Sequence, residues 1–159
     1  MSVDEYLHTT FDGADREYLD GEVIERNMGN KSHGKMQLRL GALLQNFEQK
    51  TDIFTVVEVR QKVTPTRYRI PDIAVFEGEP EEEVPSIAPL LAIEILSPDD
   101  RIGYVVPKLE EYVRWGVRSI WVVDPEDRKL FTYGKAGLHE VSELSLSQYE
   151  IVLTKKDVF

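Results

Sequence analysis

The chain has 159 residues, a length that suits one domain with a sizeable hydrophobic core. Hydrophobic residues make up 42% and charged residues 30%, which is ordinary for a soluble globular protein, and the longest apolar runs are too short to span a bilayer. The net charge of −10 argues against indiscriminate nucleic-acid binding, and the absence of cysteine excludes disulfides, zinc–thiolate sites and cysteine nucleophiles.

The first residues predict a short helix followed by a hairpin. No basic-then-apolar leader opens the chain, so we expect a cytoplasmic protein. Ser2 and Glu5 have the spacing of a capping box, which predicts a helix directly after them. Asp20-Gly21 is a strong two-residue turn signal and predicts a hairpin of residues 17–19 with 22–24.

A longer helix is predicted from Ser32 to about Gln49. Its apolar residues recur at helical spacing and form one stripe: Met36, Leu40, Leu43, Leu44 and Phe47. His33 lies at the start of this stripe, so we expect its side chain to point toward the interior. The basic residues Lys31, Lys35 and Arg39 recur every four positions and would form a second, basic stripe, which suits either a solvated helix face or a contact with a nucleic-acid backbone.

Three apolar segments after this helix predict an antiparallel meander. They are Phe54–Val63, Tyr68–Phe76 and Leu90–Leu96, with Pro65-Thr66 in the first turn. Basic residues cluster around the first hairpin, where solvated surface charge is the simplest interpretation: Arg60, Lys62, Arg67 and Arg69.

The second half predicts a crossover. Pro107 suits the first position of a helix and Gly116 its end, and the apolar strand Ser119–Val123 follows. A helix between two buried strands favours a right-handed crossover that joins parallel strands. Lys129–Tyr133 should pair back, Leu138–Val141 could add an edge strand, and the rest of the tail is expected to be peripheral. We therefore expect a mixed central sheet flanked by helices, with an N-terminal and a C-terminal hairpin.

Glu94 is the most informative residue, because it lies in the middle of the apolar segment Leu90–Leu96. A strand that is apolar on both faces is buried on both faces, and a carboxylate there costs several kcal/mol unless a cation or hydrogen bonds compensate it. Asp72 follows Pro71 in a second short apolar strand. Two acids on two buried strands indicate a site for a divalent cation such as Mg²⁺ or Mn²⁺, which prefer oxygen ligands.

Other interpretations of these residues stay open. A buried Glu can pair with an arginine or with backbone amides, and an Asp after Pro is often a turn residue. Lys108 lies in the helix after the Glu94 strand, where it could return to the acids or be a solvated lysine. Trp115 and Trp121 could stack on nucleic-acid bases, but both adjoin apolar runs, so we favour packing in the core.

The combination of Pro71-Asp72, Glu94 on the next strand and a following basic residue resembles the PD-(D/E)xK nuclease superfamily. Within it, the chain resembles the Uma family of putative restriction endonucleases over nearly its whole length. The resemblance rests on these segments: Ser2–Leu7, Glu17–Glu22, His33, Ile93–Pro98, Lys108–Tyr112, Gly116-Val117 and Trp121–Pro125. One departure from the superfamily is that residue 96 is leucine, where the short motif has lysine.

The resemblance implies a single restriction-endonuclease-like domain over residues 1–159 and a metal-dependent endonuclease acting on DNA. It implies that Asp72 and Glu94 are metal ligands together with the Ile95 carbonyl, and that Lys108 replaces the missing lysine of the motif. It also implies supporting roles for Glu17 and His33 at the rim. For Glu17 we favour an ordinary hairpin charge, and for His33 a polar histidine at a helix start is an equally good interpretation.

The sequence leaves two function classes open. The first is a Mg²⁺-dependent nuclease, for which a homodimer is expected by analogy, because cutting two strands usually needs two active sites. The second is a non-catalytic module that keeps the nuclease fold, binds a protein partner and carries a vestigial metal site. The net charge of −10 favours the second class, or a nuclease that depends on another chain for DNA binding.

Overall fold

The computed structural model describes residues 1–100 and 102–159. Its helices are α1 (Val3–His8), α2 (Lys31–Glu48), α3 (Ile102–Trp115) and α4 (Lys155–Val158), with a short 3-10 helix at Ser147–Tyr149. Its strands are β1 (Glu17–Leu19), β2 (Glu22–Ile24), β3 (Ile53–Val57), β4 (Gln61–Thr64), β5 (Arg67–Arg69), β6 (Ile73–Glu77), β7 (Leu91–Ile95), β8 (Ser119–Asp124), β9 (Lys129–Gly134), β10 (Gly137–Val141), β11 (Glu143–Leu146) and β12 (Ile151–Thr154).

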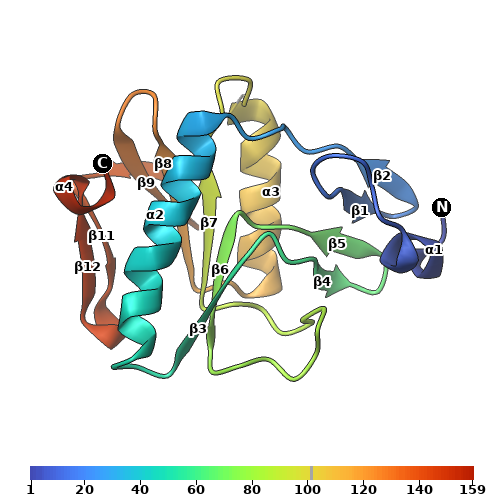
Figure 1. Cartoon of the computed structure of the whole chain (residues 1–159), viewed down its shortest axis with the longest axis horizontal. Helices are drawn as coiled ribbons and strands as arrows, with labels where there is room; N and C mark the ends of the chain where they lie inside the picture. The colour runs from blue at the N-terminus through green and yellow to red at the C-terminus, as the bar shows by residue number, and fades with distance from the viewer. Residues whose placement is uncertain (101) are drawn as a thin grey trace.

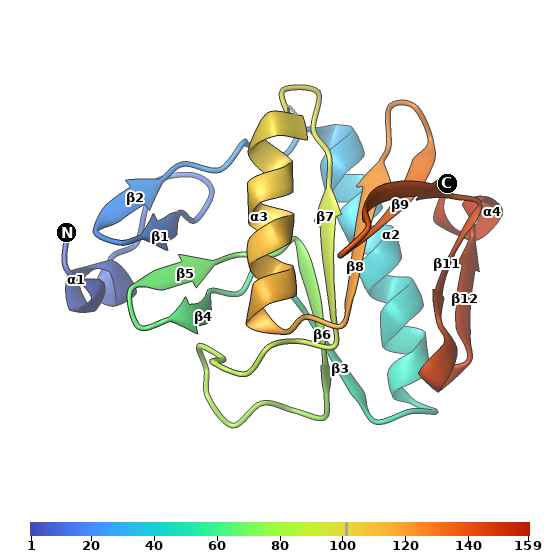
Figure 2. The ribbon, with the colours of Figure 1, turned by 180° about the vertical axis from the view of Figure 1, so that it is seen from behind.

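The central sheet has six strands in the order β10-β9-β8-β7-β6-β3. β7 and β8 run parallel and are joined through α3, which confirms the predicted crossover, and the other neighbours are antiparallel. α2 covers one face of this sheet and α3 the other (Figures 1 and 2). β7 is therefore buried on both faces, as the apolar run around Glu94 predicts. In the described ranges, every helix is too short or too polar to cross a membrane.

A separate four-stranded sheet, in the order β2-β1-β5-β4, lies beside the central sheet with α1 at its outer end (Figure 1). Its presence corrects the prediction that residues 54–63 and 68–76 each form one strand. The first segment breaks at Glu58, which has a φ of +51°. The second breaks at Pro71, which has no N–H to donate to a ladder. Both segments thus pass from one sheet to the other, and Asp72 lies at this junction.

Helix α3 begins earlier than predicted. It starts at Ile102, so Pro107 lies inside it and is not its first residue. A proline at this position removes the hydrogen bond to Gly103, which is exposed near the start of the helix, so the loss is small. The predicted end is confirmed, because Gly116 follows the last turn with a φ of +109°. Lys108 therefore lies well inside the helix, beyond the turn in which the helix dipole disfavours a cation.

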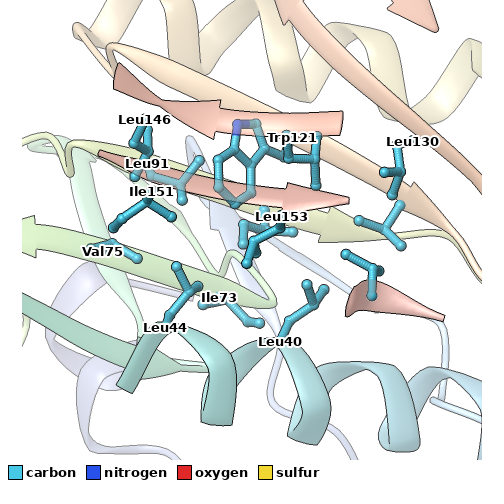
Figure 3. Close-up of a cluster of buried hydrophobic side chains, with 14 of the residues drawn as sticks. Leu40, Leu44, Ile73, Val75, Leu91, Trp121, Leu130, Leu146, Ile151 and Leu153 are labelled. Carbon is cyan, nitrogen blue, oxygen red and sulfur yellow. The ribbon is translucent and has the colours of Figure 1, made fainter. Parts of the chain in front are cut away.

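The C-terminal tail is part of the core, which corrects the expectation that it is peripheral. β11 and β12 form a hairpin whose alternate residues Leu144, Ile151 and Leu153 are almost fully buried. Figure 3 shows these strands lying over Trp121, with Leu40 and Leu44 of α2 on the other side of the cluster. Trp121 is 1% exposed, so it packs in the core as favoured and is not available to stack on bases.

Candidate active site

Asp72 and Glu94 lie next to each other at the junction of the two sheets. Ile73 is paired with Ile93 across β6 and β7, so residues 72 and 94 continue the same register on one face. Asp72 Oδ2 accepts a hydrogen bond of 2.7 Å from the backbone N–H of Ile95, the residue after Glu94. The Asp72 and Glu94 residues are only 4% and 8% exposed. The structure therefore brings both predicted acids to one buried place.

Glu94 is held by two groups of helix α3. The Tyr112 hydroxyl donates to Glu94 Oε1 at 2.7 Å, and Lys108 Nζ lies 3.0 Å from the same oxygen. Burial raises the pKa of Glu94 to about 7, and the charge of Asp72 adds to this rise while Lys108 opposes it. Burial therefore destabilises the ionised form of Glu94 more than Lys108 stabilises it.

The Lys108 side chain is 14% exposed and lies among acids, so the interpretation as a solvated lysine is wrong. Its Nζ lies 2.8 Å from Glu17 Oε1 and 3.0 Å from Glu94 Oε1, and it donates to the Ile70 carbonyl at 3.3 Å. Burial alone would lower the pKa of Lys108, but the charges of Glu17, Glu94 and Asp72 outweigh it and raise the pKa to about 12. The ammonium group is thus permanently charged at physiological pH.

Glu17 is an internal partner of this lysine, so its interpretation as an ordinary hairpin charge is also wrong. The residue is 4% exposed, its Oε2 lies 2.8 Å from Arg69 Nη1, and its Oε1 accepts from Ile70 N at 2.9 Å. Burial would raise the pKa of Glu17, but the charges of Lys108 and Arg69 outweigh burial and hold the pKa at about 2. Glu17 therefore keeps its negative charge and fixes Lys108.

Two further groups contact Asp72. His33 Nε2 lies 3.3 Å from Asp72 Oδ2, so the histidine at the start of α2 reaches the site. The hydrogen bond to Asp72 raises the pKa of His33. Arg26 Nη2, in the connection between β2 and α2, donates to Asp72 Oδ1 at 3.1 Å. Burial would raise the pKa of Asp72, but the hydrogen bond from His33 and the nearby cations lower it, so this carboxylate is ionised.

The site continues outward as a chain of alternating charges. Beyond Glu17, Arg69 pairs with Glu111, Glu111 with Arg67, and Arg67 with Asp20 at the surface turn of β1–β2. The basic cluster around the first hairpin is therefore largely ion-paired within the protein. Its remaining arginine, Arg60, pairs with Asp15 at 2.6 Å. This corrects the interpretation of these arginines as solvated surface charge.

The basic stripe on α2 does not join the site. Lys31, Lys35 and Arg39 are exposed, whereas His33 on the same helix is buried, so the stripe faces away from Asp72. These residues line a groove of about 410 Å³ together with Arg128 and the C-terminal Phe159. Arg39 Nη1 also donates to the Phe159 carbonyl at 3.0 Å. Any contact of this stripe with a ligand would lie on the far side of α2 from the acids.

The donor set fits a small divalent cation. No cluster of three or more His, Cys, Asp or Glu side chains suited to a metal occurs in residues 1–100 and 102–159. Mg²⁺, however, is usually held by only one or two carboxylates, with water and substrate oxygens completing its shell. Asp72 and Glu94 supply two such carboxylates, and burial, which raises the pKa of Glu94, leaves its ionised form in need of a cation. These two residues could therefore hold Mg²⁺ or Mn²⁺.

Sequence reasoning missed Tyr112 and Arg26 as site residues. Tyr112 follows Lys108 by one helical turn, so the spacing places both on one face of α3 and could have revealed it. Arg26 lies in a polar connection without periodicity, and nothing in its surroundings in the sequence points to Asp72.

The chain is similar to known proteins in sequence and in fold. Residues 3–155 match the model of the Uma2 family, described as putative restriction endonuclease. The crystal structure of a putative nuclease belonging to DUF820 from Anabaena variabilis ATCC 29413 is similar to the whole chain, with a TM-score of 0.87 and 23% sequence identity. The similarity covers 100% of this chain and 97% of that one, and it shows a restriction-endonuclease-like fold. No curated protein matches the chain.

Proposed function

Because this chain belongs to the Uma2 family of putative restriction endonucleases, we propose that it is a metal-dependent endonuclease that hydrolyses DNA phosphodiester bonds. The observation that carries this proposal is the convergence of Asp72, Glu94 and Lys108 in one buried site. Perturbed pKa values cluster at catalytic sites, and here two acids and a lysine with perturbed pKa values share one sheet junction.

The chemistry follows from the residue types. A divalent cation bound by Asp72 and Glu94 would polarise a phosphate oxygen and activate a water molecule. Tyr112 orients Glu94 through its hydroxyl, and Glu17 orients Lys108. The permanently charged Lys108 stabilises negative charge that develops on the phosphate. Helix α3 thus supplies the lysine that the strand lacks at Leu96.

The proposal is tested by metal-linked stability. Thermal unfolding of wild type and Asp72→Asn is measured with and without Mg²⁺, and each protein is compared with itself. Mg²⁺ at 100 times its dissociation constant should stabilise wild type by about 2.7 kcal/mol, a shift of several degrees, and should not stabilise the mutant. Asp12→Asn, in an exposed loop, serves as the control and should respond like wild type.

Plasmid cleavage supplies the second measurement. Nicking or linearisation that requires Mg²⁺ and disappears in Asp72→Asn and Glu94→Gln supports the nuclease. A wild-type protein that neither gains stability with Mg²⁺ nor cuts DNA would contradict the proposal.

One observation favours the second class, a non-catalytic nuclease-fold module with a vestigial metal site that binds a protein partner. Arg26 pairs with Asp72 and Lys108 with Glu94, so the negative charges of the two acids are partly compensated without a metal. The net charge of −10 also opposes DNA binding. Unchanged stability in Mg²⁺, together with intact folding, would favour this class.

We also propose that Lys31, Lys35 and Arg39 contact the DNA backbone and that the protein acts as a homodimer. All three are exposed cations on an otherwise acidic chain. The dimer rests on analogy, since cutting both strands usually needs two sites. Light scattering after size-exclusion chromatography should give twice the 18.3 kDa mass of one chain. A mass equal to that of one chain would contradict the dimer.

A further inference from the structure

Arg26 enters the site from the connection between β2 and α2. Its side chain is 11% exposed, and its Nη2 lies 3.1 Å from Asp72 Oδ1 and 3.8 Å from Glu58 Oε1. Its other terminal nitrogen, Nη1, is buried and has no hydrogen-bond partner among residues 1–100 and 102–159. A neighbouring contact ties this connection to the loop after β7, because Asn27 Nδ2 donates to Asp100 Oδ1 at 2.6 Å.

An unsatisfied buried guanidinium nitrogen is costly, because a buried donor normally finds an acceptor. Arg26 makes one hydrogen bond to Asp72 and leaves half of its planar end unused. This end can make two parallel hydrogen bonds, which matches the geometry of a carboxylate or phosphate. The arrangement therefore suits an anionic ligand that is absent from the protein itself.

The two oxygens of Asp72 have different partners. Oδ2 accepts from Ile95 N and lies against His33, whereas Oδ1 contacts Arg26. Oδ1 is therefore the oxygen with capacity for a metal ligand bond. A doubly charged cation competes with a guanidinium for this oxygen, and the released Arg26 would then need another acceptor beside the acids.

We propose that Arg26 is a phosphate-binding residue of this site, which exchanges Asp72 for the phosphate to be cleaved when a divalent cation takes that carboxylate. The inference rests on the proposed nuclease function and adds a substrate contact to it. The alternative is a structural role, in which Arg26 is only a fixed counter-ion that holds the buried Asp72 side chain in position.

Two binding measurements separate these roles. Mn²⁺ binding without DNA is followed by calorimetry, and binding of a fluorescent DNA duplex by anisotropy, with Ca²⁺ as the metal probe so that turnover stays low. In Arg26→Gln, Mn²⁺ should bind about tenfold tighter, because a competing charge-assisted hydrogen bond is removed. In the same variant, the duplex should bind about tenfold more weakly in Ca²⁺, because glutamine does not replace the paired hydrogen bonds of the guanidinium to phosphate.

Two variants serve as matched controls. Arg118→Gln removes an equal charge from an exposed arginine that pairs with Glu77, so it reports the general effect of net charge and should leave Mn²⁺ binding unchanged. Arg26→Lys keeps the charge and so protects folding, but an ammonium group lacks the planar fork, so its duplex affinity in Ca²⁺ should fall several-fold.

Opposite shifts of metal and DNA affinity in Arg26→Gln support the inference. If Arg26 only held Asp72 in place, its loss would displace this metal ligand and weaken the binding of both Mn²⁺ and DNA. Unchanged or weaker Mn²⁺ binding, or unchanged duplex binding in Ca²⁺, overturns it, as does wild-type duplex affinity in Arg26→Lys. Should wild type bind Mn²⁺ through Asp72 while these shifts are missing, only the role of Arg26 fails. Should wild type bind no Mn²⁺ at all, the nuclease proposal fails with it.

Discussion

Lys108 Nζ lies 2.8 Å from Glu17 Oε1, and this ion pair joins helix α3 of the central sheet to the first strand of the small sheet. Breaking a buried pair by removing one partner leaves an uncompensated charge, which costs about 3 kcal/mol. Glu17→Gln should therefore lower the free energy of unfolding by about this amount, measured by urea denaturation.

The neighbouring Glu22 gives a matched control, because it lies in the same hairpin and is exposed. Glu22→Gln should change the stability by less than about 0.5 kcal/mol. Acid titration gives an independent check. The pKa of Glu17 is depressed to about 2, so its contribution is present above its ordinary pKa of 4.5 and is lost as the pH falls toward 2. Equal losses in both variants would show that Glu17 is no special partner of Lys108.

Glu94 predicts the opposite pH dependence. Its pKa in the folded protein is raised to about 7 from an ordinary 4.5, so between these values the folded state holds a proton that the unfolded state has lost. The free energy of unfolding should therefore fall as pH rises from about 4.5 to 7 in the absence of metal. At about 1.4 kcal/mol per pKa unit, the total loss is about 3 kcal/mol.

This dependence is measured by comparing wild type with Glu94→Gln in EDTA across that pH range. Gln can still accept from Tyr112 but does not titrate, so the mutant should gain on wild type as the pH rises. Parallel stability profiles for the two proteins would mean that Glu94 ionises normally.

The pattern of apolar and polar residues in the sequence is sufficient to predict most of the architecture. The apolar run around Glu94 predicts a doubly buried strand, and the helix between it and Ser119–Val123 predicts the parallel pairing that the structure has. The breaks at Glu58 and Pro71 are not visible in the same way, because periodicity alone does not reveal where one continuous apolar segment changes sheets.

The site was only partly predictable for a related reason. Asp72 and Glu94 stand out because carboxylates are unusual in apolar strands. Lys108, Glu17 and Arg26 lie in polar or amphipathic surroundings where a charge is ordinary, and only the folded chain brings them within ion-pair distance. Lys108 and Glu17 meet where the first strand of the small sheet lies against α3, a long-range contact that leaves no local pattern.

Lys108 should matter for catalysis more than for metal binding. Lys108→Met keeps most of the length of the side chain without its charge. It should reduce DNA cleavage at least about 100-fold, because the positive charge that stabilises the developing negative charge of the phosphate is removed. Mn²⁺ binding by calorimetry should persist, since Asp72 and Glu94 remain. Cleavage at the wild-type rate in this variant would remove Lys108 from the mechanism.

The exposed lysines of α2 predict a salt-dependent effect on DNA affinity. Lys31→Gln with Lys35→Gln should weaken duplex binding equally for all sequences and reduce the slope of log affinity against log salt by about 0.9 for each phosphate that is no longer neutralised. Lys50→Gln with Lys135→Gln, at two exposed turns that do not line the groove beside α2, removes the same charge elsewhere. If the salt slope falls equally in both double variants, the effect is one of net charge. If the slope is unchanged in the α2 double variant, the DNA lies on another face of the protein.

The buried tail gives the sharpest test of the fold, because adjacent residues of β12 point in opposite directions. Leu153 is 3% exposed and packs in the main core, whereas Val152 is 47% exposed. Leu153→Ala should lower the free energy of unfolding by about 3 kcal/mol, since it leaves a cavity, and Val152→Ala should change it by less than about 0.5 kcal/mol. Urea denaturation of both variants measures the difference. If Leu153→Ala were as mild as Val152→Ala, the β11–β12 hairpin would be detached from the core, and Trp121 beneath it would lose its cover.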